Sequence, residues 1–215
     1  QLGDLTNPQA IALWQDLILL EVVIFIMAGP PCETWSVARF RALLNALKPG
    51  PRPLRSQSQL WGLTCLSKSE ANSVSLGNAL LRATIRMFYA ALCNPDCVVI
   101  MEHPRCPTWV PGAPSSWLLP ELQYIASLPN AKLLDVDQCM FGAVSKKPTS
   151  LLCLNVKNFE QFETASHQCT HLDHEEVLIG LDDNGTFRTS PSKQYPPGFC
   201  HALASIAVGQ FLSIA

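Results

Sequence analysis

The sequence carries little charge and has no hydrophobic run long enough to cross a membrane. Only 15% of its 215 residues are charged and 48% are hydrophobic, a balance that excludes wholesale disorder and suffices for the core of one medium-sized domain. The longest apolar run, residues 18–28, is interrupted by Glu21 and is much shorter than the roughly 20 residues of a membrane-spanning helix. We therefore expect residues 1–215 to form a single domain with no membrane partner, in which this run is buried core.

Signals for export are also missing. The chain opens at Gln1 without a start methionine, a basic segment or a small-residue cleavage site, so we expect it to begin inside a longer protein. Its nine cysteines are widely spread and most lie in apolar, strand-like runs, unlike those of a disulfide-stapled scaffold. These features predict reduced thiols and an intracellular location, in the nucleus or the cytoplasm.

The chain as a whole lacks an excess of positive charge. Its net charge of −2 argues against a general nucleic-acid binder with a basic surface. However, no acidic residue lies between Glu33 and Glu70, and this segment contains the basic residues Arg39, Arg41, Lys48, Arg52, Arg55 and Lys68. The segment could meet a phosphate backbone, or it could be an ordinary solvated loop.

Hydrophobic periodicity predicts alternating helices and strands. Helical spacing covers residues 8–20, 75–92, 114–128 and 199–214. Short apolar runs at residues 22–28, 97–101, 133–136 and 150–156 are typical of strands, and the first two lack polar residues, as in a parallel sheet covered on both faces. A turn is expected at residues 182–185. The predicted fold is α/β, with a mostly parallel sheet and helices on both faces.

Two chemically reactive side chains follow the first two predicted strands. Cys32 ends the segment Gly29-Pro30-Pro31-Cys32 after residues 22–28, and Glu102 follows residues 98–101 directly. Because parallel neighbours end at one edge of a sheet, where α/β folds bind ligands, we expect Cys32 and Glu102 to lie close together. A helix start and nearby arginines could give Cys32 the thiolate character of a nucleophile, while Glu102 could hold a proton or accept hydrogen bonds. The structural alternatives are a small residue packed under a turn and a carboxylate that caps the next segment.

Longer segments around these residues resemble motifs of the cytosine-5 DNA methyltransferase family. Gly29-Pro30-Pro31-Cys32-Glu33-Thr34-Trp35-Ser36 resembles the family's nucleophile motif, and Met101-Glu102-His103-Pro104 stands where the family has Glu-Asn-Val. The segment from Gln138 to Lys147 resembles a later loop of the family, and Tyr195-Pro196-Pro197 resembles its last motif. By this resemblance Cys32 and Glu102 are catalytic. Substrate binding is assigned to Pro31, Ser36, Arg39, Arg41, His103, Lys146 and Lys147.

The resemblance implies DNA as the partner and S-adenosylmethionine as the methyl donor. The Cys32 thiolate would attack C6 of a flipped cytosine while Glu102 contacts the N3 edge, because the target atom is inaccessible inside the base stack. The sequence departs from the family at His103-Pro104, and it has no glycine-rich turn or acidic strand end before Cys32. The resemblance therefore covers part of a Rossmann-like methyltransferase fold whose first strands and cofactor-binding half are missing. That missing half, or a second copy pairing at an open sheet edge, is a further expected partner.

Two other functions stay open from the sequence. One is a catalytically silent remnant of the fold that binds nucleic acid through residues 39–55. The other is a hydrolase or transferase that pairs Cys32 with a histidine such as His103. A separate cluster, His167-x-Cys169-x-His171-x-x-His174, is either a metal site or a polar surface loop. It lacks the paired spacing of structural zinc sites, so the site prediction assigns no metal.

Overall fold

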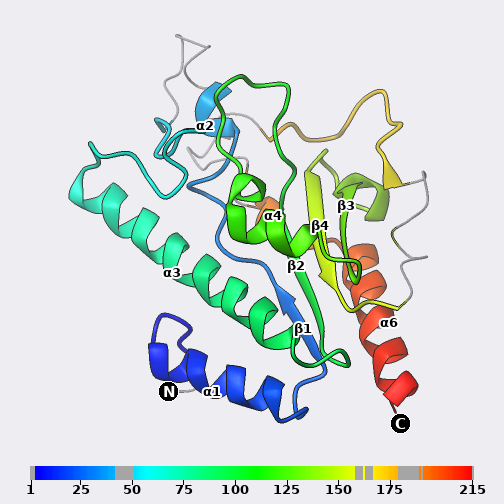
Figure 1. Ribbon diagram of the computed structural model, residues 1–215. Helices are drawn as coiled ribbons and strands as arrows, with labels where there is room; N and C mark the ends of the chain where they lie inside the picture. Colours follow the sequence, from blue (N-terminus) through cyan, green and yellow to red (C-terminus); the bar gives the residue numbers. More distant parts are fainter. Residues whose placement is uncertain are drawn as a thin grey trace.

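The computed structural model describes residues 3–41, 51–157, 162, 167–178, 189 and 191–214. These residues build a mixed α/β fold with one four-stranded sheet between two helical layers (Figure 1). In chain order the elements are α1 (Pro8–Leu19), β1 (Phe25–Ala28), α2 (Ala38–Arg41), α3 (Lys68–Ala91), β2 (Val98–Pro104), η1 (Ser116–Leu118), α4 (Pro120–Ala126), β3 (Ala131–Asp137), η2 (Gln138–Phe141), β4 (Pro148–Leu154), η4 (Pro191–Lys193) and α6 (Pro197–Ile214).

The strands are arranged in the order β1-β2-β4-β3. β1 and β2 are parallel, whereas β4 is antiparallel to both β2 and β3. The prediction of a mostly parallel sheet is therefore wrong, because the reversed strand β4 lies between two strands of the other direction. The link between β3 and β4, residues 138–147, is shorter than the dozen or so residues that a parallel crossover needs. β1, β2 and β3 still run in one direction, so their carboxyl ends lie at the same edge.

Helices α1, α3 and α4 cover one face of the sheet. Val99 and Met101 of β2 are fully buried in this layer, together with Phe88 of α3. Helix α3 begins seven residues earlier than predicted, at a capping box in which the Ser67 hydroxyl and the Glu70 carboxylate each accept a backbone N–H. The apolar periodicity missed this first part of the helix because the capping turn is polar.

Helix α6 covers the opposite face. Val98 and Ile100 alternate with the residues of the first layer along β2 and pack in a second cluster that includes Phe199 and Leu203 of α6. The predicted coverage of both faces is thus observed (Figure 1). In the part of the chain that the structure describes, no helix is long and apolar enough to span a membrane.

Strand β1 is shorter and more exposed than predicted. It begins at Phe25, since Val22 is 66% exposed and Glu21 has a left-handed φ of 61° just after helix α1. Among the described residues β2 is its one strand neighbour, and all four residues of β1 are half-buried. The prediction of a strand buried on both faces is wrong here because β1 lies at the edge of the described sheet.

Other boundaries differ for local reasons. β4 ends at Leu154 because Asn155 has a left-handed φ of 62°, and the Asn155 side-chain amide donates to the Cys97 carbonyl at 2.9 Å. The helix predicted at residues 114–128 is divided into η1 and α4, and α4 begins at Pro120. The turn predicted at residues 182–185 lies outside the described residues.

Candidate active site at the carboxyl edge of the sheet

The candidate site lies at the edge where β1, β2 and β3 end. Cys32 follows β1, Glu102 lies near the end of β2, and Gln138 directly follows β3. Because β4 runs the opposite way, it begins at this edge, directly after Lys147. Tyr195 reaches the edge from the residues before α6. The prediction that β1 and β2 are parallel neighbours whose ends bring Cys32 and Glu102 to one edge is confirmed.

Cys32 is a partly buried thiol held in a turn. The backbone N–H of Trp35 donates to the Cys32 carbonyl at 2.9 Å, which closes the turn that follows the two prolines. Burial raises the pKa of the Cys32 thiol to about 11, with a further contribution from the Glu102 carboxylate that outweighs the opposing effect of Lys147. The predicted thiolate character is therefore wrong for the resting protein. At neutral pH Cys32 is a protonated thiol.

The Glu102 side chain is 7% exposed and is held by three groups. Gln138 Nε2 donates to Oε1 at 3.3 Å, and the Tyr195 hydroxyl donates to Oε2 at 3.0 Å. Lys147 Nζ lies 3.6 Å from Oε1. Gln138 Nε2 also donates to Thr149 Oγ1 at 3.0 Å, which fixes the amide. These partners compensate the buried carboxylate and set its orientation.

Gly29 leaves room for the Tyr195 hydroxyl beside the carboxylate. A Cβ on Gly29 would lie 2.5 Å from Tyr195 Oη and 3.8 Å from Glu102 Oε2, so any larger residue would displace the hydroxyl. Burial and the negative charge of Glu102 both raise the pKa of Tyr195 above its usual range, so the phenol stays a donor. The absence of a side chain at Gly29 therefore allows Tyr195 to donate its hydrogen bond to Glu102.

Arg55 is a fully buried guanidinium that fixes the turn after Cys32. Its Nε and Nη2 donate to Thr34 Oγ1 at 3.0 and 2.8 Å, and its Nη1 donates to Asn78 Oδ1 at 2.8 Å. The guanidinium carbon lies 4.0 Å from the centroid of the Trp35 ring. Burial lowers the pKa of Arg55 to about 10, so the group is still cationic at neutral pH. Arg55 thus ties the turn after Cys32 to α3.

The other predicted substrate contacts near Cys32 have local structural partners. Ser36 Oγ accepts a backbone N–H at the start of α2 at 3.3 Å, and Arg39 donates to two backbone carbonyls at 2.7 and 3.0 Å. Pro31 is half-buried, and the side chain of Arg41 lies outside the described residues. As substrate contacts these four residues stay predictions.

Of the two predicted lysines, the structure brings Lys147 to the site. Besides approaching Glu102, its Nζ donates to the Ser192 carbonyl at 3.0 Å and lies 5.5 Å from the centroid of the Tyr195 ring. Lys146 is exposed. Lys147 is therefore a partner of the carboxylate, whereas a role for Lys146 toward substrate stays a prediction.

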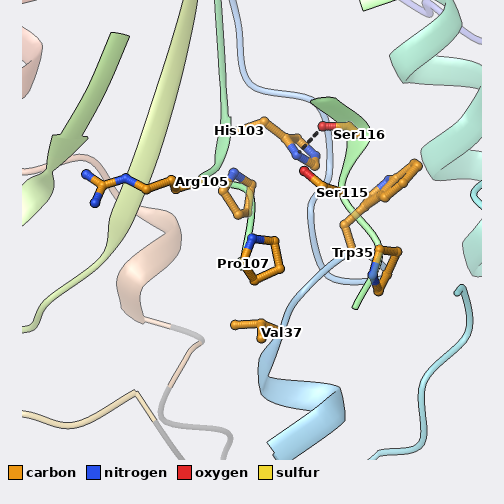
Figure 2. Close-up of a pocket in the computed structure, with 9 residues that line it drawn as sticks. Trp35, Val37, His103, Arg105, Pro107, Ser115 and Ser116 are labelled. Atoms are coloured by element: carbon orange, nitrogen blue, oxygen red, sulfur yellow. Dashed lines mark hydrogen bonds between the residues drawn. The ribbon is translucent and has the colours of Figure 1, made fainter. Parts of the chain in front are cut away.

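His103 lies on the opposite face of β2 from Glu102, because side chains alternate along a strand. Its Nδ1 is 2.8 Å from Ser116 Oγ, and burial lowers the pKa of His103 to about 3, so the imidazole is neutral. Figure 2 shows the ring beside Trp35 and Ser116 in a small cavity that Arg105 also lines. The cavity has about 20 Å³ of free volume, room for about one water. A contact of His103 with substrate stays a prediction.

The basic segment between Glu33 and Glu70 uses its described arginines internally. Arg52 donates to both carboxylate oxygens of Glu70, at 2.8 and 2.7 Å, while Arg55 is buried and Arg39 is bonded to carbonyls. Lys68 is exposed, and Lys48 lies outside the described residues. These arginines therefore stabilise the loop that surrounds the Cys32 turn.

Sequence reasoning missed Tyr195 and Arg55 as site residues and placed Gln138 only within a loop. Gln138 had a usable signal, because it is a polar residue at the carboxyl end of β3, at the same edge where Glu102 lies near the end of β2. Tyr195 is 93 residues from Glu102, and no local pattern joins them. Arg55 lies in a proline-rich segment whose composition indicates exposure, so its burial had no signal.

Comparisons with known proteins assign no family. No protein-family model matches the chain, and neither a curated protein nor a solved structure matches it. The chemistry is therefore read from the geometry of the site. A protonated thiol beside a fixed carboxylate can add to an electrophilic carbon when the carboxylate takes up the thiol proton.

Proposed function

We propose that this chain is part of a DNA cytosine-5 methyltransferase-like domain, in which Cys32 attacks C6 of a flipped cytosine and Glu102 contacts its N3 edge. One observation carries the proposal. The thiol and the fixed carboxylate lie at one sheet edge, close enough for the charge of Glu102 to raise the pKa of Cys32. The shared direction of β1, β2 and β3 supports the finer proposal of a partial Rossmann-like fold. DNA and a nuclear or cytoplasmic location belong to the same proposal.

In the addition step, Glu102 transfers the proton of the Cys32 thiol to the base. As the sulfur of Cys32 bonds to C6, the thiol proton passes to the Glu102 carboxylate and from there to N3 of the base, which becomes more basic when the ring loses its conjugation. Tyr195 and Gln138 hold the carboxylate in place during this transfer. The result is a covalent adduct with a nucleophilic C5, and reversal releases the unchanged base.

S-adenosylmethionine does not fit the described residues. The carboxyl edge of the sheet carries Cys32, Glu102 and their partners, and the described residues before β1 contain neither a glycine-rich turn nor a strand with an acidic end. Residues outside the described part would have to hold the cofactor. We expect calorimetry to show feeble or no binding of S-adenosylmethionine to this chain, whereas micromolar binding would contradict this assignment.

The two alternatives differ in what supports them. The raised pKa of Cys32 favours a catalytically silent remnant, since a nucleophile needs thiolate character at some stage. A hydrolase that pairs Cys32 with His103 has less support, because His103 bonds to Ser116 and faces the other side of β2 from Glu102. Reaction of the Cys32 thiol with a cytosine therefore distinguishes the methyltransferase-like proposal from both alternatives.

The direct test is exchange of the C5 hydrogen of cytosine with solvent. Addition of Cys32 to C6 makes C5 exchangeable, and this step requires no methyl donor. Single-stranded DNA with deuterated C5 positions is incubated with the protein, and loss of deuterium is followed by mass spectrometry. We expect exchange with the wild-type chain and none with Cys32→Ser. Glu102→Gln should slow exchange strongly because it removes the proton acceptor.

The matched control is Cys65→Ser, which removes an exposed cysteine far along the chain and should exchange as the wild type does. A DNA strand with 2-pyrimidinone in place of cytosine supplies a second measurement, because its more electrophilic ring should leave an adduct that resists denaturing gels. An adduct in the Cys32→Ser protein would show that another residue is the nucleophile. DNA binding without exchange or adduct in any variant would favour the silent remnant.

A further inference from the structure

We propose that Cys139, Cys169, His171 and His174 bind one Zn²⁺ ion. One ligand atom from each of these side chains lies within 4.8 Å of all the others. The site is separate from the Cys32 and Glu102 pair, and the inference does not depend on the proposed function.

The spacing of the ligand atoms suits a tetrahedral ion. Cys169 Sγ is 3.3 Å from His174 Nε2 and 3.7 Å from His171 Nδ1. With bond lengths of about 2.3 Å to sulfur and 2.0–2.1 Å to nitrogen, neighbouring ligand atoms of a tetrahedral zinc lie about 3.3–3.8 Å apart. Both distances fall in this range. The ligand atoms all lie within 4.8 Å of one another, so the widest separation needs to close by about 1–1.5 Å at most when the ion binds.

Two segments that are distant in sequence supply the ligands. Cys139 belongs to η2, while the other three ligands lie in the loop of residues 167–178. The Cys169 backbone N–H donates to Asp137 Oδ2 at 2.8 Å, and Gln168 Nε2 donates to the Asp135 carbonyl at 2.7 Å. The loop is therefore already docked on the end of β3 with its thiol facing η2. Sequence spacing alone hid the site because the fourth ligand is 30 residues before the local trio.

The ligand set favours zinc over calcium and magnesium. Two thiols and two imidazoles in a tetrahedral arrangement are typical of structural zinc, whereas calcium and magnesium require oxygen ligands. Burial is graded, with Cys139 buried, Cys169 and His174 half-buried and His171 exposed. An ion can thus enter from solvent and become closed in by four protein ligands, which leaves no open position for catalysis. His167 is not among the clustered residues, and its ring stacks on Phe141 with centroids 4.6 Å apart.

The position of the ion gives it a structural role. Cys139 directly follows Gln138, which donates to Glu102. Zinc would join the loop of residues 167–178 to η2 and so fix the segment that carries Gln138. Because ligands that bind only the folded state stabilise it, removal of zinc should lower the melting temperature of the protein.

The experiment measures zinc in the intact chain. Protein purified with a reductant and zinc, then freed of loose metal, should retain about one zinc per chain by elemental mass spectrometry. Replacement by Co²⁺ should give the strong visible absorption of a tetrahedral ion and a sulfur-to-cobalt charge-transfer band. Cys139→Ser, Cys169→Ser and His174→Gln should each lose most of the metal.

The matched controls replace an exposed cysteine and an exposed histidine outside the cluster, Cys65→Ser and His201→Gln, and should keep the metal. Because a variant could lose zinc simply by unfolding, alkylation of the wild-type protein provides a second measurement. Zinc should protect Cys139 and Cys169 from alkylation, and a chelator should remove this protection. Retained zinc in both cysteine variants, or a wild-type protein that holds no zinc, would overturn the proposal. So would an octahedral cobalt spectrum or a Cys139–Cys169 disulfide under reducing conditions.

Discussion

Cys32 and Glu102 are coupled through charge, and this coupling can be measured on single residues. The pKa of Cys32 is raised to about 11 by burial and by Glu102, while Lys147 opposes the rise. Because only the thiolate reacts with iodoacetamide, alkylation of Cys32 should be slow at pH 8 and increase up to about pH 11. Glu102→Gln should move this profile to lower pH, and Lys147→Met should move it to higher pH.

Peptide mass spectrometry after timed alkylation gives the profile for each cysteine in one sample. Cys65 and Cys93 are exposed and provide the internal comparison, since they should react faster than Cys32 at pH 8. Equal alkylation rates at Cys32 and Cys65 at pH 8 would contradict the coupling. So would a pH profile of Cys32 alkylation that does not change in Glu102→Gln.

The Tyr195 hydroxyl is a second residue whose contribution can be isolated. Tyr195→Phe removes a donor at 3.0 Å from the buried Glu102 carboxylate while keeping the ring. Hydrogen bonds to charged groups contribute about 1.5–3 kcal/mol, so the free energy of unfolding should fall by about that amount in urea titrations. Tyr124→Phe is the matched control, because Tyr124 is 53% exposed, and it should change the stability by less than about 0.5 kcal/mol. Similar losses of unfolding free energy in both variants would show that the Tyr195 hydroxyl does not stabilise Glu102.

At the scale of residues, the sequence identified site residues that lie near the ends of strands. It missed site residues that distant segments of the chain bring to the same place. Cys32 and Glu102 could be identified because a polar or reactive residue directly after an apolar run marks a strand end. Tyr195 and Cys139 depend on contacts between segments far apart in the chain. Such contacts are decided by tertiary packing, which the periodicity of a single segment does not contain.

At the scale of elements, Arg55 links the turn after Cys32 to helix α3. Arg55→Met keeps much of the volume but leaves the acceptors of Thr34 and Asn78 without their buried donor. We expect the free energy of unfolding to fall by about 3 kcal/mol or more. The matched control is Arg82→Met, since the exposed Arg82 also lies over a ring, that of Trp61 at 4.1 Å, and should cost about 0.5–1 kcal/mol. Equal losses in urea titrations would contradict the role of Arg55.

The direction of β4, and with it the antiparallel pairing of the sheet, was not predicted from the sequence. Apolar runs gave the positions of the four strands, and the helices between them gave the α/β class. The direction of β4 depends on which neighbour it pairs with, and both directions suit an apolar run. The short link of residues 138–147 was the available signal for an antiparallel pair.

The outer edge of β1 gives a prediction about association. Among the described residues β1 pairs with β2 alone, so its other edge carries unpaired backbone donors and acceptors beside apolar side chains. We expect copies of the chain to associate along this edge, either as a dimer or as larger aggregates. Light scattering coupled to gel filtration should show a mass that rises with protein concentration. A monomeric mass at every concentration would contradict this pairing.

At the scale of the whole molecule, His103 links stability to pH. Burial lowers the pKa of His103 to about 3, with smaller effects of Arg55 and Lys147, so the folded protein keeps it neutral while the unfolded chain takes up a proton near pH 6.5. The unfolded state therefore binds more protons between these values, and stability falls as the pH falls below about 6.5. From pH 7 to pH 5 this group should remove about 2 kcal/mol of stability.

Urea titrations at both pH values check the effect. His103→Gln keeps a partner for Ser116 but does not titrate, so its loss of stability between pH 7 and pH 5 should be about 2 kcal/mol smaller than that of the wild type. His201→Gln, at an exposed position, should lose as much as the wild type. If His103→Gln and the wild type lose equal stability, the folded protein does not hold His103 neutral.

Strand β2 presents Glu102 to one side of the sheet and His103 to the other, in separate surroundings. Side chains alternate with a period of two, so an insertion or deletion of one residue within β2 would carry an imidazole to the thiol and a carboxylate into the tryptophan-lined cavity. A change of two residues would keep both assignments. Both assignments are thus kept only when the length of this segment changes by an even number of residues.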